Sequence, residues 1–129
     1  MARILVVDDE PHIAKLISFS LEKAGHEITS ASDGLTAITL ARDEQPELIL
    51  MDVMMPLMTG YEAVEKLKED PETAEIPVIM LSAKSQQYEK ERGIESGAAH
   101  YICKPFTPRE LVEQVSEFLE SLEGDGGAG

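Results

Sequence analysis

Five polar side chains in this sequence stand at or just after the ends of short apolar runs. Carboxylate oxygens are the ligands that Mg2+ prefers, an aspartate can act as a nucleophile towards phosphorus, and lysine and serine side chains can bind phosphoryl oxygens. The chemistry that these residue types share is magnesium-assisted phosphoryl transfer. The residues that would carry it out are Asp8, Asp9, Asp52, Ser82 and Lys104.

The order of these residues predicts a single site. Ligands of an open parallel sheet bind beyond the carboxyl ends of its strands. Asp8 and Asp9 close the first apolar run and Asp52 closes the third. Each pair of such carboxylates would repel by about 4 kcal/mol at an effective dielectric constant of about 20, so a cation is expected among them. Asp52 would then carry the phosphoryl group, with Lys104 and Ser82 contacting its oxygens.

Each of these residues also has an ordinary structural explanation when it is taken alone. An aspartate such as Asp8 or Asp9 often caps a helix or forms a turn, and Ser82 can do the same. Lys104 precedes a proline, where a solvated turn residue is common. A helix cap formed by Asp9 or Glu10 would also be compatible with metal binding. The ordinary explanations weaken only because all five residues fall at predicted strand ends.

The elements that must position these residues follow from the apolar pattern. Short runs rich in Val, Ile and Leu alternate with segments of helical period, which is typical of a doubly wound α/β fold with a parallel sheet. The predicted strands cover 3–8, 26–31, 47–52, 76–82 and 99–103. The predicted helices cover Pro11 to Gly25, 34–45, 60–69, 86–96 and 108–122, and the first should bury Ile13, Leu16, Ile17 and Leu21.

Composition limits the classes of partner and compartment. The chain has 129 residues, enough for one domain, and carries a formal net charge of -14. Such a surface repels phosphate backbones and anionic lipids, so we expect no direct nucleic-acid or membrane binding, and a basic partner is easier to accommodate. No apolar run approaches a signal peptide or a membrane span, which favours the cytoplasm. Cys103 is the only cysteine and predicts no disulfide.

Four motifs, in order and in register, resemble the receiver domain of bacterial response regulators, in particular the chemotaxis-regulator type, and the similarity covers residues 3 to 122. Together they are far more specific than any one alone. They are Ile4-Leu5-Val6-Val7-Asp8-Asp9-Glu10, Leu50-Met51-Asp52-Val53-Met54-Met55-Pro56-Leu57-Met58-Thr59-Gly60, Val78-Ile79-Met80-Leu81-Ser82-Ala83 and Tyr101-Ile102-Cys103-Lys104-Pro105-Phe106.

This resemblance implies a flavodoxin-like, five-stranded parallel sheet in the order 2-1-3-4-5 with five helices. It implies that a sensor histidine kinase or phosphotransfer protein phosphorylates Asp52. Asp9 and Asp52 would be direct Mg2+ ligands, Asp8 a ligand through water, and the carbonyl of Met54 a further ligand. Lys104 would contact the phosphoryl group and precede a cis bond to Pro105.

The resemblance also implies a switch. The Ser82 hydroxyl would move towards the phosphoryl group while Tyr101 turns inward, changing an output face formed by the fourth helix, fifth strand and fifth helix. Ser82 stands where threonine is commoner, and the missing methyl would loosen its rotamer. Outside this context, Tyr101 would be explained as a half-buried strand aromatic.

Other functions fit the sequence less well. A flavodoxin-type electron carrier needs a phosphate loop after the first strand, where this chain has Asp8-Asp9-Glu10-Pro11, and no G-x-G-x-x-G follows any strand. A phosphatase with an aspartyl nucleophile needs a second catalytic acid two residues after that nucleophile. Here that position is Met54, which is not an acid. A phosphate-independent adaptor remains an alternative. We therefore expect a phosphoacceptor signalling domain that catalyses only its own phosphorylation and dephosphorylation.

The expected organisation is a receiver domain over 1–122 and a flexible glycine-rich tail or linker stub over 123–129. That tail suits a stand-alone regulator and a receiver within a longer protein equally well. The kinase, the signal and the downstream protein stay unknown from sequence, and both a monomer and a phosphorylation-dependent dimer are compatible with it.

Overall fold

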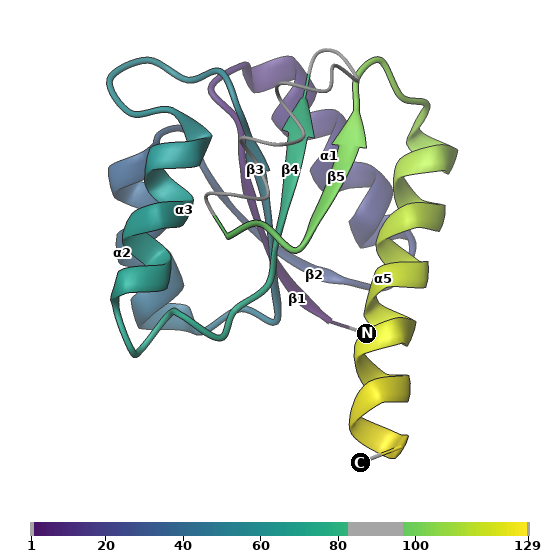
Figure 1. The fold of residues 1–129 in the computed structure, drawn as a ribbon. Coiled ribbons are helices and arrows are strands. Elements are labelled where there is room, and N and C mark those ends of the chain that lie inside the picture. The colour runs from purple at the N-terminus through teal and green to yellow at the C-terminus, as the bar shows by residue number, and fades with distance from the viewer. Residues whose placement is uncertain (1, 83–96, 129) are drawn as a thin grey trace.

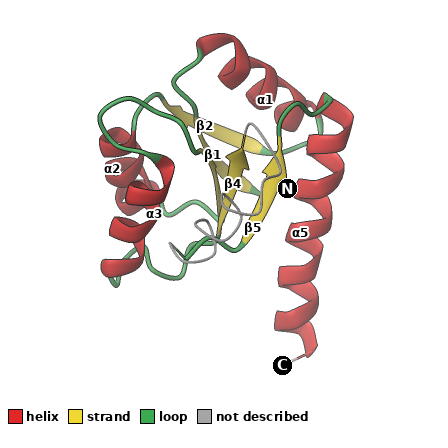
Figure 2. Cartoon of the chain, turned by 45° about the horizontal axis from the view of Figure 1, so that its top comes forward, coloured by secondary structure: helices red, strands yellow, loops and turns green. Residues whose placement is uncertain are grey.

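The protein is a five-stranded parallel sheet covered by helices on both faces. The computed structural model describes residues 2–82 and 97–128, with the backbone alone for 124–128. The sheet order is β2-β1-β3-β4-β5, with α2 and α3 on one face and α1 and α5 on the other (Figures 1 and 2). In chain order the elements are β1 (Arg3–Val7), α1 (Pro11–Lys23), β2 (Glu27–Ala31), α2 (Gly34–Glu44), β3 (Leu48–Asp52), α3 (Gly60–Glu69), β4 (Val78–Ser82), β5 (His100–Cys103) and α5 (Pro108–Ala128).

The predicted fold class and strand order are therefore confirmed. Each strand starts or ends one or two residues inside its predicted range. The helix predicted over 86–96 lies outside the described residues. The backbone of α5 continues to Ala128, beyond the expected end at Leu122, and no proline follows to stop it. The division into a domain and a tail stays a prediction.

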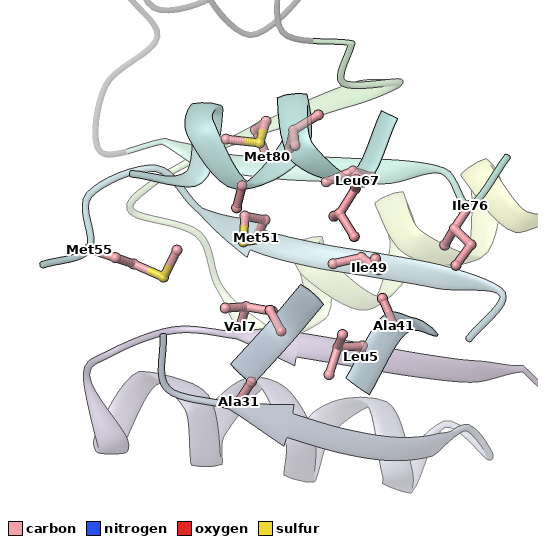
Figure 3. Close-up of a cluster of buried hydrophobic side chains, with 14 of the residues drawn as sticks. Leu5, Val7, Ala31, Ala41, Ile49, Met51, Met55, Leu67, Ile76 and Met80 are labelled. Atoms are coloured by element: carbon pink, nitrogen blue, oxygen red, sulfur yellow. The ribbon is translucent and has the colours of Figure 1, made fainter. Parts of the chain in front are cut away.

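Alternating side chains of the central strands fill two separate cores. Leu5 and Val7 point towards α2 and α3, into the cluster drawn in Figure 3, whereas Ile4 and Val6 point towards α1 and α5. Every residue of β3 and of β4 is buried. Such strands have no solvent face, which explains why they appear in the sequence as continuous apolar runs. Each fully buried aliphatic side chain contributes about 1.5–3 kcal/mol to the free energy of folding.

Local signals set where the helices begin. Pro11 is the first residue of α1, as predicted, and Gly25 takes a φ of 101° just beyond the helix. The α3 helix opens with a capping box in which Thr59 and Glu62 each bond the other's backbone N–H. One expectation for α1 was wrong, because Leu16 is 40% exposed, whereas Ile17 and Leu21 are buried.

The exposure of Leu16 follows from the width of the buried stripe. Only the α1 positions that face the sheet are fully covered, and Leu16 lies at the margin of that face, beside α5.

Within the part of the chain that the structure describes, no helix combines the length and the apolar character needed to span a membrane.

Candidate functional site

The polar residues predicted at the strand ends meet at the carboxyl edge of the sheet. Asp52 is the last residue of β3 and Ser82 the last of β4, while Asp8 directly follows β1 and Lys104 directly follows β5. The backbone N–H of Lys104 donates to the carbonyl of Ser82, which ties the fifth strand's exit to the fourth. The parallel register therefore places side chains that are distant in the sequence around one point.

Three carboxylates form the centre of this edge. Asp8, Asp9 and Asp52 each offer an oxygen, and these oxygens lie within 4.8 Å of one another. Asp8 is 2% exposed and Asp52 4% exposed, whereas Asp9 is half-buried. An all-oxygen set of this size suits a hard divalent cation such as Mg2+, which takes one or two carboxylates and keeps several waters. The residues present thus fit the expected metal.

Lys104 supplies the positive charge within the chain itself. Its Nζ lies 3.4 Å from Oδ2 of Asp8 and 3.3 Å from Oδ1 of Asp52, and its side chain is 19% exposed. Burial alone would lower the pKa of Lys104, but the carboxylates of Asp52 and Asp8 outweigh it and raise that pKa. The ammonium therefore stays charged between two carboxylates that would otherwise repel each other.

The pKa of Asp52 is raised from 3.8 to about 6. Burial is the main cause and the nearby charge of Asp8 adds to it, whereas Lys104 opposes both by its charge and its hydrogen bond. A further cation among the carboxylates would favour the ionised form, which is the form that can attack phosphorus. The site is thus arranged so that cation binding and the nucleophilic state of Asp52 support each other.

Asp8 also forms the turn after β1, in addition to being part of the site. Its Oδ1 accepts the backbone N–H of Glu10 at 2.9 Å, and its Oδ2 faces Lys104. Glu10 occupies the N-cap position of α1, but its side chain makes no capping hydrogen bond. One carboxylate therefore shapes the turn after β1 and contributes charge to the site at the same time.

The remaining predicted residues surround this centre. Ser82 is fully buried at the end of β4. Met54 lies in the loop after β3 with its side chain 68% exposed, and the expected role concerns its carbonyl rather than that side chain. Tyr101 is half-buried on β5 and packs against the α2 and α3 core. The peptide bond between Lys104 and Pro105 is cis, as expected.

Two residues that support the site were not singled out from the sequence. A Cβ on Gly60 would lie 2.3 Å from the backbone carbonyl oxygen of Asp52, so α3 begins directly against the end of β3. The next residue, Tyr61, places its hydroxyl 3.3 Å from that of Tyr101. A glycine at a helix start is a weak signal, and nothing local in the sequence indicates the pairing of two tyrosines 40 positions apart.

Comparison with known proteins is consistent with this geometry. Residues 4–116 match the model of the response regulator receiver domain. The chain is 42% identical over 123 residues to the DNA-binding dual master transcriptional regulator RpaA of Synechocystis, covering 95% of this chain and 51% of that protein. It is 40% identical over 119 residues to protein PilH of Pseudomonas aeruginosa, covering 92% of this chain and 98% of that one.

A solved structure shares the fold. The receiver domain of sensor histidine kinase PA1611 from Pseudomonas aeruginosa, which holds a magnesium ion in its active-site cleft, superimposes with a TM-score of 0.82. The two are 29% identical, and the match covers 90% of this chain and 95% of that one. The chain spans about half the length of RpaA and of several other curated relatives.

Proposed function

Because this chain belongs to the response regulator receiver domain family of two-component signalling systems, we propose that Asp52 accepts a phosphoryl group from a phosphohistidine with the help of Mg2+. The observation that carries the proposal is the position of Lys104. Its ammonium lies between the carboxylates of Asp8 and Asp52, and Asp52 is the last residue of the buried strand β3. The carboxylate of Asp9 belongs to the same group of oxygens. A structural salt bridge would need only one of these carboxylates.

The residues of the chain divide the transfer among them. A carboxylate oxygen of Asp52 forms a bond to phosphorus while the bond from phosphorus to the imidazole nitrogen of the donor breaks. The electron pair stays on that nitrogen, and the product on this chain is an acyl phosphate. Lys104 pairs with phosphoryl oxygens, and the Ser82 hydroxyl donates a hydrogen bond to another.

Asp8, Asp9, Asp52 and the backbone carbonyl of Met54 would hold the cation. When bound, Mg2+ neutralises charge on the carboxylates and on the transferring group. The all-oxygen donor set supports this assignment, and so does the magnesium ion in the cleft of the PA1611 receiver domain. Direct ligation by Asp9 and Asp52, and ligation by Asp8 through water, are parts of the proposal.

Phosphorylation would change the conformation of an output face, which a downstream protein would recognise. Ser82 would approach the phosphoryl group and Tyr101 would respond, changing the face that includes β5 and α5 together with the predicted fourth helix, which lies outside the described residues. Receiver domains are signalling domains rather than conventional enzymes. We propose that this one catalyses only its own phosphorylation and dephosphorylation, in the cytoplasm, and passes the signal to a downstream protein as a monomer or a phosphorylation-dependent dimer.

The direct test is the intact mass of the protein after incubation with phosphoramidate or acetyl phosphate, with and without Mg2+. We expect a gain of one phosphoryl group that requires Mg2+ and that hydroxylamine removes. Asp52→Asn should stay unmodified, and Asp43→Asn, an exposed aspartate on α2, should be modified like the wild type.

The other outcomes decide between functions. Full modification of Asp52→Asn would place the acceptor elsewhere and contradict the proposal. Steady hydrolysis of small phosphoesters would indicate a phosphatase instead. No modification of the wild type under any condition would favour a phosphate-independent adaptor.

A further inference from the structure

Two tyrosine hydroxyls meet beside the proposed site. The hydroxyl oxygens of Tyr61 and Tyr101 lie 3.3 Å apart, in a partly buried position. Tyr61 lies at the start of α3 and Tyr101 lies within β5. The contact therefore joins the helix that begins near the carboxyl edge of the sheet to a strand that ends at that edge. Asp52 ends the strand before α3, and Lys104 follows β5 directly.

Tyr61 is the fixed member of this pair. It is 7% exposed and belongs to the core beneath α2 and α3. The residue before it, Gly60, lies against the carbonyl of Asp52 and donates its N–H to the carbonyl of Val53 at 2.9 Å. The capping box formed by Thr59 and Glu62 holds the same turn. The Tyr61 ring is therefore tied to the segment that carries the phosphoacceptor.

Tyr101 is the adjustable member. It is half-buried and packs against the α2 and α3 core, while its neighbour Ile102 points into the opposite core and His100 is exposed. In the sheet it is paired with Met80 of β4. A ring in this position has its apolar body covered, but its hydroxyl must find a polar partner to avoid a desolvation cost. The Tyr61 hydroxyl is such a partner.

The contact joins the turn after β3 directly to the ring on β5. We infer that Tyr61 is a positioning residue that holds the Tyr101 ring inward against the α2 and α3 core, so that a contact within the chain biases the switch proposed for Tyr101. The regulatory meaning of this inference rests on the proposed function, whereas the positioning itself does not. A net hydrogen bond of ordinary strength would change the ratio of inward to outward rings by roughly two- to tenfold.

The first experiment measures the pair without any phosphoryl chemistry. Tyrosine-labelled protein is compared by NMR in the wild type, Tyr61→Phe, Tyr101→Phe and the double variant, and urea unfolding is recorded for all four. We expect Tyr61→Phe to shift the Tyr101 ring signals towards the solvent-exposed position. The stability cost of Tyr61→Phe should be smaller in the Tyr101→Phe background than in the wild type, because a double-mutant cycle reports the coupling energy of a direct contact.

Two results would overturn the inference at this stage. One is an unchanged Tyr101 ring environment in Tyr61→Phe. The other is the same loss of stability in both backgrounds, which would make Tyr61 a core residue without a positioning role. Because phenylalanine keeps the ring and removes only the hydroxyl oxygen, the variant retains the packing of the α2 and α3 core.

The second experiment links the pair to the site. Beryllofluoride with Mg2+, a mimic of the phosphoryl group on aspartate, is titrated into the same four proteins. If the inward ring favours the mimic, Tyr61→Phe raises the apparent Kd by at most the factor that NMR measures for the inward-to-outward ratio. The rise should be absent in the Tyr101→Phe background.

The outcomes separate the two proposals. Equal affinities in all four proteins, together with normal phosphorylation of Asp52, would overturn the regulatory inference and leave the proposed function intact. No binding to the wild type, with the tyrosine coupling still measurable, would contradict the proposed function and leave the positioning role in place.

Discussion

At the scale of single residues, the carboxyl group of Asp52 connects the chemistry of the site to the stability of the fold. Its pKa is about 6 in the folded chain against 3.8 in the reference state, chiefly because of burial and the charge of Asp8. The folded chain thus binds this proton more tightly than the unfolded chain does. The stabilising contribution is present below about pH 4 and is lost as the pH rises towards about 6.

Asp52→Asn should therefore make the metal-free protein more stable at pH 7, by about 1–3 kcal/mol, and should have little effect near pH 4. The difference arises because the ionised carboxylate no longer has to be buried beside Asp8. Urea unfolding in the presence of a chelator at the two pH values measures it. Asp43→Asn, at an exposed position, is the matched control. Equal stabilities of wild type and Asp52→Asn at pH 7 would contradict the prediction.

Leu57 carries backbone strain that its own packing does not offset. Its φ is 70°, in the left-handed region, and its side chain is 98% exposed. Asparagine tolerates this region better than leucine does, whereas alanine does not. We expect Leu57→Asn to raise the free energy of unfolding by about 0.5–1 kcal/mol and Leu57→Ala to leave it nearly unchanged. Thermal unfolding of the three proteins tests this, and equal effects of asparagine and alanine would rule out relief of strain.

The sequence was informative about residues at strand ends and less so about residues that depend on distant contacts. Asp8, Asp9, Asp52 and Lys104 were predicted to converge, because parallel strands bring their carboxyl ends to one edge. Helical period alone predicts that Leu16 faces inward, but the period does not tell how wide a stripe of α1 the neighbouring elements cover. The pairing of Tyr61 with Tyr101 depends on side chains from different elements.

At the scale of elements, the junction between β3 and α3 leaves no room for a side chain at Gly60. A Cβ at Gly60 would meet backbone of Asp52, which cannot move aside cheaply, whereas a Cβ at Gly34 would meet only the flexible side chain of Met58. Both glycines are the first residue of a helix. The pair therefore offers the same substitution in two different surroundings.

Gly60→Ala should lower the free energy of unfolding by about 1–3 kcal/mol and slow the modification of Asp52 by phosphoramidate, because α3 must move away from the end of β3. Gly34→Ala should be close to neutral in both measurements, since the thioether of Met58 can change rotamer. Urea unfolding and the mass measurement supply the two readouts. If both variants behaved alike, the close approach of α3 to Asp52 would not be what requires glycine.

The element order was predictable because apolar runs and helical segments alternate with clear stops between them. The exact strand ends were not, because a polar residue beside a buried run can be the last residue of the strand, as Asp52 is, or the first of the turn, as Asp8 is. Tertiary hydrogen bonds make that choice. The extent of α5 beyond Leu122 cannot be predicted from its sequence either, because its glycines oppose a helix there while Glu123 and Ala128 favour one and no proline ends it.

At the scale of the whole molecule, the net charge of -14 works against compactness. Raising the ionic strength with potassium chloride should raise the melting temperature of every variant, because salt screens the repulsion between surface carboxylates. Mg2+ at matched ionic strength should add a further, saturable increase in the wild type. That increase should be much smaller in Asp52→Asn. Equal effects of Mg2+ on both proteins would indicate surface screening rather than a site.

The complete burial of β3 and β4 affects how often different parts of the domain open to solvent. Backbone amides in strands without a solvent face exchange their hydrogens with water only when the whole domain unfolds, whereas loops open far more often. Asp52 stands at the last position of one of these strands. A phosphoryl group on Asp52 would therefore be attached to a slowly opening strand, and its effects would be carried by faster-opening residues such as those of the loop 53–59 after β3.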